Sequence, residues 1–147
     1  MAKKSQNRQV STTQDEKTSI LLVSPDDQDR SSLKSILSNG DWQIVQSNTV
    51  RQATTALNTV KPALVVCERE LEDGGWREVL DLCLQRAEHP AVLVTSRLAD
   101  ESLWAEVLNV GGFDVLLKPF EENEVTRVVG MASRYTPQHR FASSQIA

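Results

Sequence analysis

The feature that most constrains the fold of this chain is a set of short apolar segments, separated by longer segments of mixed polarity. Three of them, each four or five residues long, are Ser19–Val23, Leu64–Cys67 and Ala91–Val94. Because they are too short for buried helices, each predicts a β-strand. Their interiors lack the polar alternation of a half-exposed strand, which is typical of parallel sheets that helices cover on both faces.

The segments between these strands have the spacing of amphipathic helices. The first begins with Ser24-Pro25-Asp26-Asp27, which predicts a helix start with Ser24 as the N-cap and Pro25 in the first turn. Apolar residues at helical spacing predict four further helices, over about 50–60, 76–84, 100–110 and 121–134. Two more strands are predicted at about 42–46 and 114–117.

Five strands that alternate with five helices predict one α/β domain over about 18–134, a (βα)5 fold. Right-handed crossovers give a doubly wound parallel sheet, for which we expect the flavodoxin-like strand order 2-1-3-4-5. The polar segments on either side, 1–17 and 135–147, are expected to be disordered tails.

Three polar side chains stand at the ends of three predicted strands. Glu68, Thr95 and Lys118 each come directly after one of them. In an open α/β sheet, functional groups gather at the edge formed by the carboxyl ends of the strands. We therefore expect an acid, a hydroxyl and an amine to meet at that edge.

The composition excludes several classes of function. A net charge of −4 argues against binding to a nucleic-acid backbone. No apolar stretch reaches the roughly 20 residues that span a bilayer, and no apolar region follows Lys3 and Lys4 as it would in a secretory signal. We therefore expect a cytoplasmic protein without a membrane partner. Cys67 and Cys83 lack metal-binding spacing and are interpreted as core residues rather than a disulfide.

Together these segments resemble the receiver domain of bacterial response regulators, in the CheY-like superfamily. The resemblance covers about 18–134 and is most specific at Gly112–Phe120. The other matching segments are Ile20–Val23 before an acidic loop, Pro62–Glu68, Asp73-Gly74-Gly75 and Thr95-Ser96. The resemblance implies a domain that accepts a phosphoryl group on an aspartate, beside a Mg²⁺ ion held by carboxylates.

The chain departs from the family pattern at positions that this chemistry needs. Glu68 stands at the position of the acceptor aspartate. Ser24 and Pro25 stand where the family has two metal-binding acids, and Val115 stands where it has an aromatic switch residue. Glu68 is longer than aspartate by one carbon–carbon bond, about 1.5 Å, which displaces its carboxylate from the in-line geometry of phosphoryl transfer.

The other residues at this edge match the family. Thr95 and Lys118 match residues that contact the phosphoryl group, and the bond between Lys118 and Pro119 is often cis in this family. Glu68 then has two interpretations. It is either a fixed imitation of phosphoaspartate or a structural partner for the Lys118 ammonium.

The resemblance and these departures predict a pseudo-receiver, an atypical receiver domain that is not an enzyme. We expect it to need no cofactor and to signal by protein–protein contact, with a histidine kinase or a downstream effector as partner. The family's usual contact face combines the fourth helix, the fifth strand and the fifth helix, and a homodimer through this face is a further expectation.

Two alternatives remain open. One is a conventional response regulator that takes phosphate on another acid, with Mg²⁺ held by Asp26 or Asp27. Both of these aspartates also suit the positive end of a helix dipole. The other is a flavodoxin-like domain that binds a small ligand in the crevice between the first and third strands.

Three aromatic or titratable residues outside this edge carry structural expectations. Trp42 and Trp104 fit apolar faces and are expected to be wholly or partly buried rather than interaction anchors. His89 lies in a loop before Pro90 and is expected to be solvated.

Overall fold

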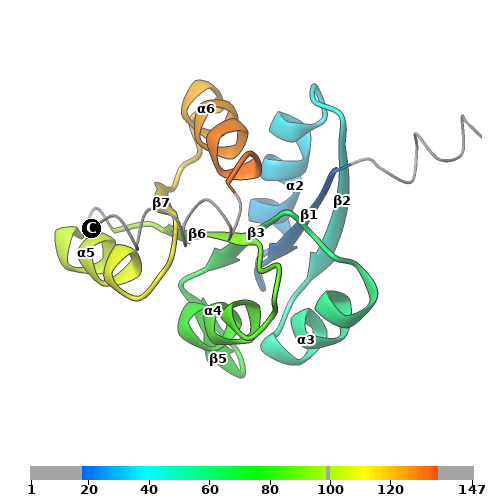
Figure 1. The fold of residues 1–147 in the computed structure, drawn as a ribbon. Coiled ribbons are helices and arrows are strands. Elements are labelled where there is room, and N and C mark those ends of the chain that lie inside the picture. Colours follow the sequence, from blue (N-terminus) through cyan, green and yellow to red (C-terminus); the bar gives the residue numbers. More distant parts are fainter. Residues whose placement is uncertain (1–17, 99, 136–147) are drawn as a thin grey trace, which may run out of the picture.

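The computed structural model describes residues 18–98 and 100–135 as a sheet with helices on both faces (Figure 1). The predicted tail 1–17 and all of the predicted tail 135–147 except Tyr135 lie outside the described residues. The strands of the main sheet are β1 (Thr18–Val23), β2 (Trp42–Ser47), β3 (Leu64–Glu68), β6 (Ala91–Ser96) and β7 (Asp114–Leu117). The helices are α2 (Asp27–Leu37), α3 (Val50–Thr59), α4 (Trp76–Leu84), α5 (Glu101–Asn109) and α6 (Glu122–Ser133).

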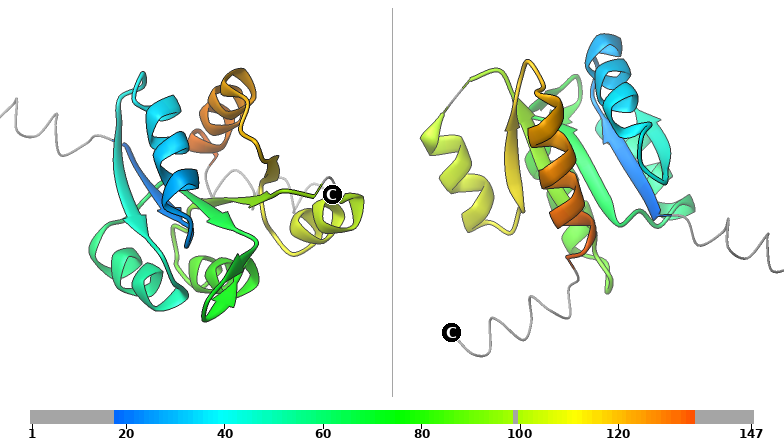
Figure 2. Two further views of the ribbon diagram at one scale, coloured as in Figure 1. Left: turned by 180° about the vertical axis from the view of Figure 1, so that it is seen from behind. Right: turned by 90° about the horizontal axis from the view of Figure 1, so that it is seen from above.

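The five strands of the main sheet run parallel in the order β2-β1-β3-β6-β7. This confirms the flavodoxin-like order expected from the sequence. Figures 1 and 2 show α2 and α6 on one face of the sheet and α3, α4 and α5 on the other. The reversal of strand order between β1 and β3 places their carboxyl ends side by side, where ligands bind in such sheets.

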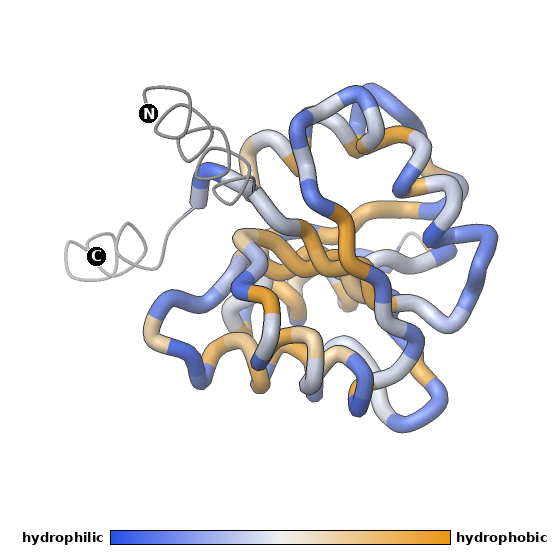
Figure 3. The backbone as a smooth tube through the Cα atoms, turned by 90° about the vertical axis from the view of Figure 1, so that its right-hand side faces the viewer, coloured by the Kyte–Doolittle hydropathy of each residue, from blue (hydrophilic) through white to orange (hydrophobic). Residues whose placement is uncertain are grey.

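The core has two halves because successive residues of each strand point to opposite faces. On β1, Leu21 and Val23 pack with the α3, α4 and α5 half, whereas Ile20 and Leu22 pack with the α2 and α6 half. All four side chains are buried. Each such side chain stabilises the fold by about 1.5–3 kcal/mol. Figure 3 shows the most apolar segments gathered in the central strands.

Helix α2 begins later than the sequence predicts. Its N-cap is Asp26, whose Oδ1 accepts hydrogen bonds from the backbone N–H groups of Gln28 at 2.8 Å and Asp29 at 3.4 Å. The prediction of Ser24 as the N-cap is therefore wrong. The backbone of Ser24 still pairs with the neighbouring strand, because its N–H donates a hydrogen bond to the carbonyl of Ser47 at 3.0 Å. Its buried hydroxyl instead accepts a hydrogen bond from the Asp26 N–H at 3.1 Å.

Helix α5 buries a narrower face than the sequence predicts. Leu103 and Val107 are buried, but Leu108 is 38% exposed and Trp104 is 51% exposed. The expectation that Trp104 is wholly or partly buried is therefore wrong. The helix lies over the β7 margin of the sheet, so only one stripe of its side chains meets the core. Trp42, by contrast, is half-buried and packs on the α2 and α6 half, as expected.

A small hairpin between β3 and α4 adds a feature that the sequence does not predict. It consists of β4 (Glu70–Leu71) and β5 (Gly74–Gly75), which pair antiparallel. At its turn, the Asp73 carboxylate accepts hydrogen bonds from the backbone N–H groups of Val50 at 2.8 Å and Arg51 at 3.1 Å. These bonds, led by the one from Val50, lower the pKa of Asp73. The turn thereby caps α3.

Candidate functional site

The carboxyl edge of the sheet brings the three expected side chains together. Glu68 is the last residue of β3 and lies beside Thr95 of β6 in the parallel register. The Thr95 hydroxyl donates a hydrogen bond to Glu68 Oε1 at 2.9 Å, and Lys118 Nζ donates to the same oxygen at 2.6 Å. Lys118 follows β7 and is joined to Pro119 by a cis peptide bond.

A fourth side chain, Asp29, completes this edge. Lys118 Nζ also donates a hydrogen bond to Asp29 Oδ2 at 2.6 Å, which links the first turn of α2 to the residue after β7. The sequence motifs do not single out Asp29, because a helix that started at Ser24 would place it in a different turn. The acid itself, five residues after Ser24, is the signal that could have found it.

These four residues, Asp29, Glu68, Thr95 and Lys118, form what we call the carboxyl-edge cluster. Its charged side chains are largely shielded from water, with exposures of 8% for Lys118, 13% for Asp29 and 15% for Glu68. Burial by itself lowers the pKa of Lys118, but the hydrogen bonds and charges of Asp29 and Glu68 outweigh it and raise that pKa. The cluster therefore holds its lysine as an ammonium ion between two carboxylates.

The residues at and next to the positions where the family has metal-binding acids make other contacts in this structure. Ser24 is buried, and its backbone carbonyl accepts a hydrogen bond from the Arg30 guanidinium. Pro25 is exposed and has no side-chain oxygen. Asp26 caps α2, while Asp27 forms an ion pair with Arg30 and keeps 91% of its own side chain exposed. The Asp26 carboxylate meets Asp29 through the backbone N–H of that residue and not through the charged side chains of the carboxyl-edge cluster.

The side chains at this edge do not fit a Mg²⁺ ion. That ion prefers near-octahedral coordination by oxygen, usually including carboxylates. The two carboxylates that approach each other here, Asp29 and Glu68, are already bridged by the ammonium of Lys118. Within residues 18–98 and 100–135, no group of three or more His, Cys, Asp or Glu side chains is placed to hold a metal ion.

The position of the family's aromatic switch holds a smaller side chain. Val115 on β7 is half-buried and packs against the α3, α4 and α5 half of the core. Its register partner is Val94, and the neighbouring Thr95 is buried with its hydroxyl on Glu68. Val115 thus has no aromatic ring at the position where the resemblance implies one.

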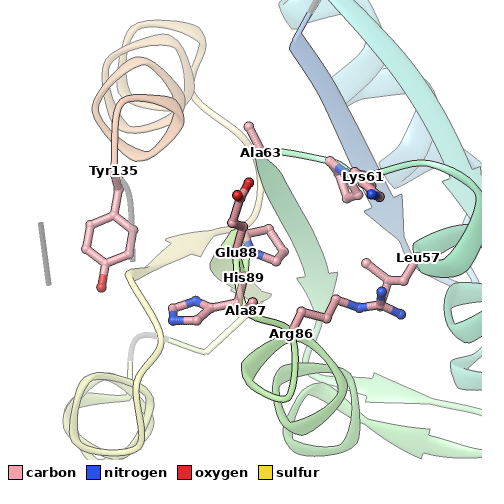
Figure 4. Close-up of a pocket in the computed structure, with 10 residues that line it drawn as sticks. Leu57, Lys61, Ala63, Arg86, Ala87, Glu88, His89 and Tyr135 are labelled. Atoms are coloured by element: carbon pink, nitrogen blue, oxygen red, sulfur yellow. The ribbon is translucent and has the colours of Figure 1, made fainter. Parts of the chain in front are cut away.

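A groove with a volume of about 650 Å³ lies at the amino-terminal ends of the strands, at the other end of the sheet from the carboxyl-edge cluster (Figure 4). His89 lies in its wall and is half-buried, with Nδ1 shielded from water and without a hydrogen-bond partner in the described part of the chain. The expectation that His89 is solvated is therefore wrong. In the loop before β6, Ala87 and Glu88 are exposed, whereas His89 is half-buried and Pro90 is buried.

Two further expectations concern the cysteines and the possibility of a membrane-spanning segment. Cys67 and Cys83 are both free and buried, which confirms their interpretation as core residues. None of the described helices is long and apolar enough to cross a bilayer.

Comparison with known proteins defines the class to which this fold and edge belong. The family model described as "Response regulator receiver domain" matches residues 20–130, and the chain belongs to this family. It is therefore a receiver domain of the kind found in two-component response regulators.

Two curated relatives and one solved structure illustrate the similarity. The chain is 26% identical over 117 residues to the KDP operon transcriptional regulatory protein KdpE of Escherichia coli, covering 80% of this chain and 52% of KdpE. It is 24% identical over 131 residues to the photosynthetic apparatus regulatory protein RegA of Rhodobacter capsulatus, covering 87% of this chain and 71% of RegA. The signal receiver domain of a putative LuxO repressor protein from Vibrio parahaemolyticus has the same fold, with a TM-score of 0.75 at 21% identity over 80% of this chain and 91% of that one. The chain thus spans about half the length of KdpE.

Proposed function

We propose that this chain is a cytoplasmic pseudo-receiver that signals through protein–protein contact without a phosphorylation cycle. The observation that carries the proposal is the double hydrogen bond to Glu68 Oε1, from the Thr95 hydroxyl at 2.9 Å and from the Lys118 ammonium at 2.6 Å. In the family, these two donors contact the phosphoryl group. Here the donors already bind a permanent carboxylate.

The chemistry of the edge supports this proposal in two ways. Two hydrogen bonds to one carboxylate oxygen, one of them from a cation, stabilise the negative charge of Glu68 and so weaken the carboxylate as a nucleophile. The position before α2 also offers a buried serine and a proline in place of the carboxylates that would hold Mg²⁺. Electrostatic stabilisation of a transferring phosphoryl group would therefore lack its metal ion.

Treatment with acetyl phosphate and Mg²⁺, followed by intact-mass spectrometry, tests this proposal. We expect no mass gain, and no Mg²⁺-dependent change in tryptophan fluorescence on addition of beryllofluoride. A receiver domain with aspartate at the acceptor position serves as the positive control. A phosphoryl adduct on the wild-type chain would overturn the proposal and favour a conventional response regulator.

The partner face that we propose consists of α5, β7 and α6. A groove of about 430 Å³ lies between these elements and is lined by exposed Trp104 together with Asp114, Leu117 and Arg127, among others. The Trp104 indole N–H donates a hydrogen bond to Asp114 Oδ1 at 3.1 Å, which fixes the orientation of the ring. An exposed tryptophan with a fixed orientation is the type of residue that carries much of the binding energy at protein interfaces.

The role of the Glu68 charge separates the two interpretations of this residue. If Glu68 imitates phosphoaspartate, Glu68→Gln should weaken the binding of a partner kinase or effector recovered with the wild-type chain. If the residue is only a structural partner of Lys118, the variant should bind that partner with unchanged affinity. Trp104→Ala is the matched variant for the proposed face and should weaken the same complex.

A further inference from the structure

The groove at the amino-terminal edge of the sheet lies at the other end of the strands from the carboxyl-edge cluster. Its walls come from the segments that lead into β3 and β6 and from the ends of three helices. We call it the amino-edge groove, lined by Leu57, Lys61, Pro62, Ala63, Arg86, Ala87, Glu88, His89, Pro90 and Tyr135. Its volume of about 650 Å³ falls in the range of small-molecule sites. None of its residues takes part in the function proposed above.

The amino-edge groove is positive on a protein that is negative as a whole. Lys61 and Arg86 supply two permanent cations and Glu88 supplies one carboxylate, in a chain of net charge −4. Within residues 18–98 and 100–135, Lys61 has no ion pair or hydrogen bond through its ammonium. Arg86 Nη2 donates to the neutral amide oxygen of Asn58 at 2.9 Å. The two cations are therefore not neutralised by carboxylates of the described chain.

Two polar atoms in the wall of this groove are buried without a partner. They are Arg86 Nε and His89 Nδ1, the two side-chain atoms with this property in the described part of the chain. A buried polar group without a hydrogen bond costs about 1–3 kcal/mol, and most such groups in native proteins are paired. Both atoms belong to residues of one groove, so the unpaired polar groups of residues 18–98 and 100–135 gather at the place where the two cations also lie.

The remaining wall of the groove is aromatic and apolar. Figure 4 shows Tyr135 on the α6 side, Arg86 and Lys61 extending toward the α3 side, and His89 between them. The Tyr135 ring is supported by an edge contact with Phe113, with ring centroids 5.6 Å apart. The groove thus offers the flat rings of Tyr135 and His89 toward one end and the cations of Arg86 and Lys61 toward the other.

We propose that the amino-edge groove binds an aromatic phosphate, such as a nucleoside monophosphate. The phosphate lies between Lys61 and Arg86, where two cations suit a dianion. The ring lies against Tyr135 and His89, where offset stacking is favourable. Glu88 opposes the phosphate by charge repulsion and limits the affinity.

Isothermal titration of the full chain with three probes tests this site. Adenosine 5′-monophosphate carries both recognised groups, adenosine carries only the ring, and inorganic phosphate carries only the anion. We expect a Kd below about 1 mM for the monophosphate and at least about tenfold weaker binding of the other two. Absence of binding by the monophosphate, or equal binding of adenosine, would overturn the proposal.

Charge-altering variants show whether binding occurs in this groove. Lys61→Gln and Glu88→Gln both change exposed side chains and should leave the fold intact. We expect the first to weaken monophosphate binding about fivefold or more, and the second to strengthen it. Lys34→Gln, on the exposed surface of α2, is the matched control and should bind like wild type. Unchanged affinity in both groove variants would contradict the proposal, whatever the outcome of the phosphorylation test.

Discussion

At the scale of single residues, the central feature is a lysine held between two acids. Lys118 bridges Asp29 and Glu68 in a largely buried position, so the three charges depend on one another. Removing one member of a buried ionic group leaves uncompensated charge, which costs far more than the intact group contributes. The carboxyl-edge cluster is therefore a sensitive point of the fold as well as of the proposed function.

The variant Lys118→Met tests how strongly the fold depends on the intact carboxyl-edge cluster. We expect the free energy of unfolding to fall by about 3–5 kcal/mol, because Asp29 and Glu68 are left facing each other without a cation. Urea denaturation followed by circular dichroism at neutral pH measures the change. Lys34→Met, at an exposed position of α2, should stay within about 0.5 kcal/mol of wild type. A similarly small change in Lys118→Met would show that the cluster is not buried in solution.

The second prediction at this scale concerns pH. The pKa of Lys118 in the folded protein is raised above its ordinary value of 10.5. The stability contributed by its charge is therefore fully present below that ordinary value and is lost as the pH rises through the higher, folded-state pKa. We expect wild type to lose stability above about pH 10 more steeply than Lys118→Met, whose curve lacks this group. Parallel curves of melting temperature against pH would contradict the expectation.

At the scale of elements, the order of strands and helices can be predicted from the sequence, but the residue at which α2 begins cannot. The apolar runs of β1, β3 and β6 leave few alternatives to a covered parallel sheet, and the polar residues after them meet where the topology puts them. The start of α2 depends on a competition between Ser24 and Asp26 to cap it. Ser24 still pairs with the end of β2, because its N–H donates to the carbonyl of Ser47. Asp26 therefore supplies the cap, with hydrogen bonds from two backbone N–H groups of the first turn. Asp29 becomes part of the site only once that start is known.

Trp104 shows a second limit of predictions that rest on the helical spacing of apolar residues. Helical spacing identifies an apolar face, but the width of the buried stripe depends on what lies opposite. Helix α5 covers the β7 margin of the sheet, so Leu103 and Val107 fill the contact and Trp104 stays outside. The spacing of apolar residues also does not reveal that Asp73 caps α3, because Asp73 and its hydrogen-bond donor Val50 are far apart in the sequence.

A capping experiment belongs to this scale. Asp26→Ala should lower the free energy of unfolding by about 1 kcal/mol, the usual contribution of an N-cap side chain. Asp27→Asn removes a neighbouring exposed charge but keeps an oxygen that can accept from the Arg30 guanidinium, and it should change stability by less than about 0.5 kcal/mol. Chemical denaturation of the two variants in parallel makes the comparison. Equal losses would mean that the charge near the helix N-terminus matters, rather than the hydrogen bonds of Asp26.

At the scale of the whole molecule, the core of the described residues has two halves, one on each face of the main sheet. Cys67 on β3 and Cys83 on α4 lie in one half, and both are buried. Burial raises the pKa of both thiols, that of Cys83 to about 12. Both cysteines are therefore protonated at neutral pH and inaccessible, so their chemistry reports the opening of this half of the domain.

Thiol labelling supplies the prediction at this scale. We expect Ellman's reagent to modify neither cysteine of the native chain on the timescale of minutes, and both of them in denaturant. The rate at intermediate denaturant concentrations should follow the population of unfolded protein measured by circular dichroism. Rapid labelling of one cysteine in native buffer would instead reveal a local opening around β3 or α4.

The bridged arrangement of Lys118 has a consequence for anyone who tries to engineer this domain. Glu68→Asp alone would shorten one arm of the cluster but leave Lys118 bound to Asp29, with a serine and a proline still preceding α2. Carboxylates would be needed at Ser24 and Pro25 as well, and each would bring new negative charge beside Glu68 and Asp29 without a metal ion to offset it. Every single step toward a phosphate-driven switch is thus expected to be unfavourable alone, and the change would have to be made as one coordinated set.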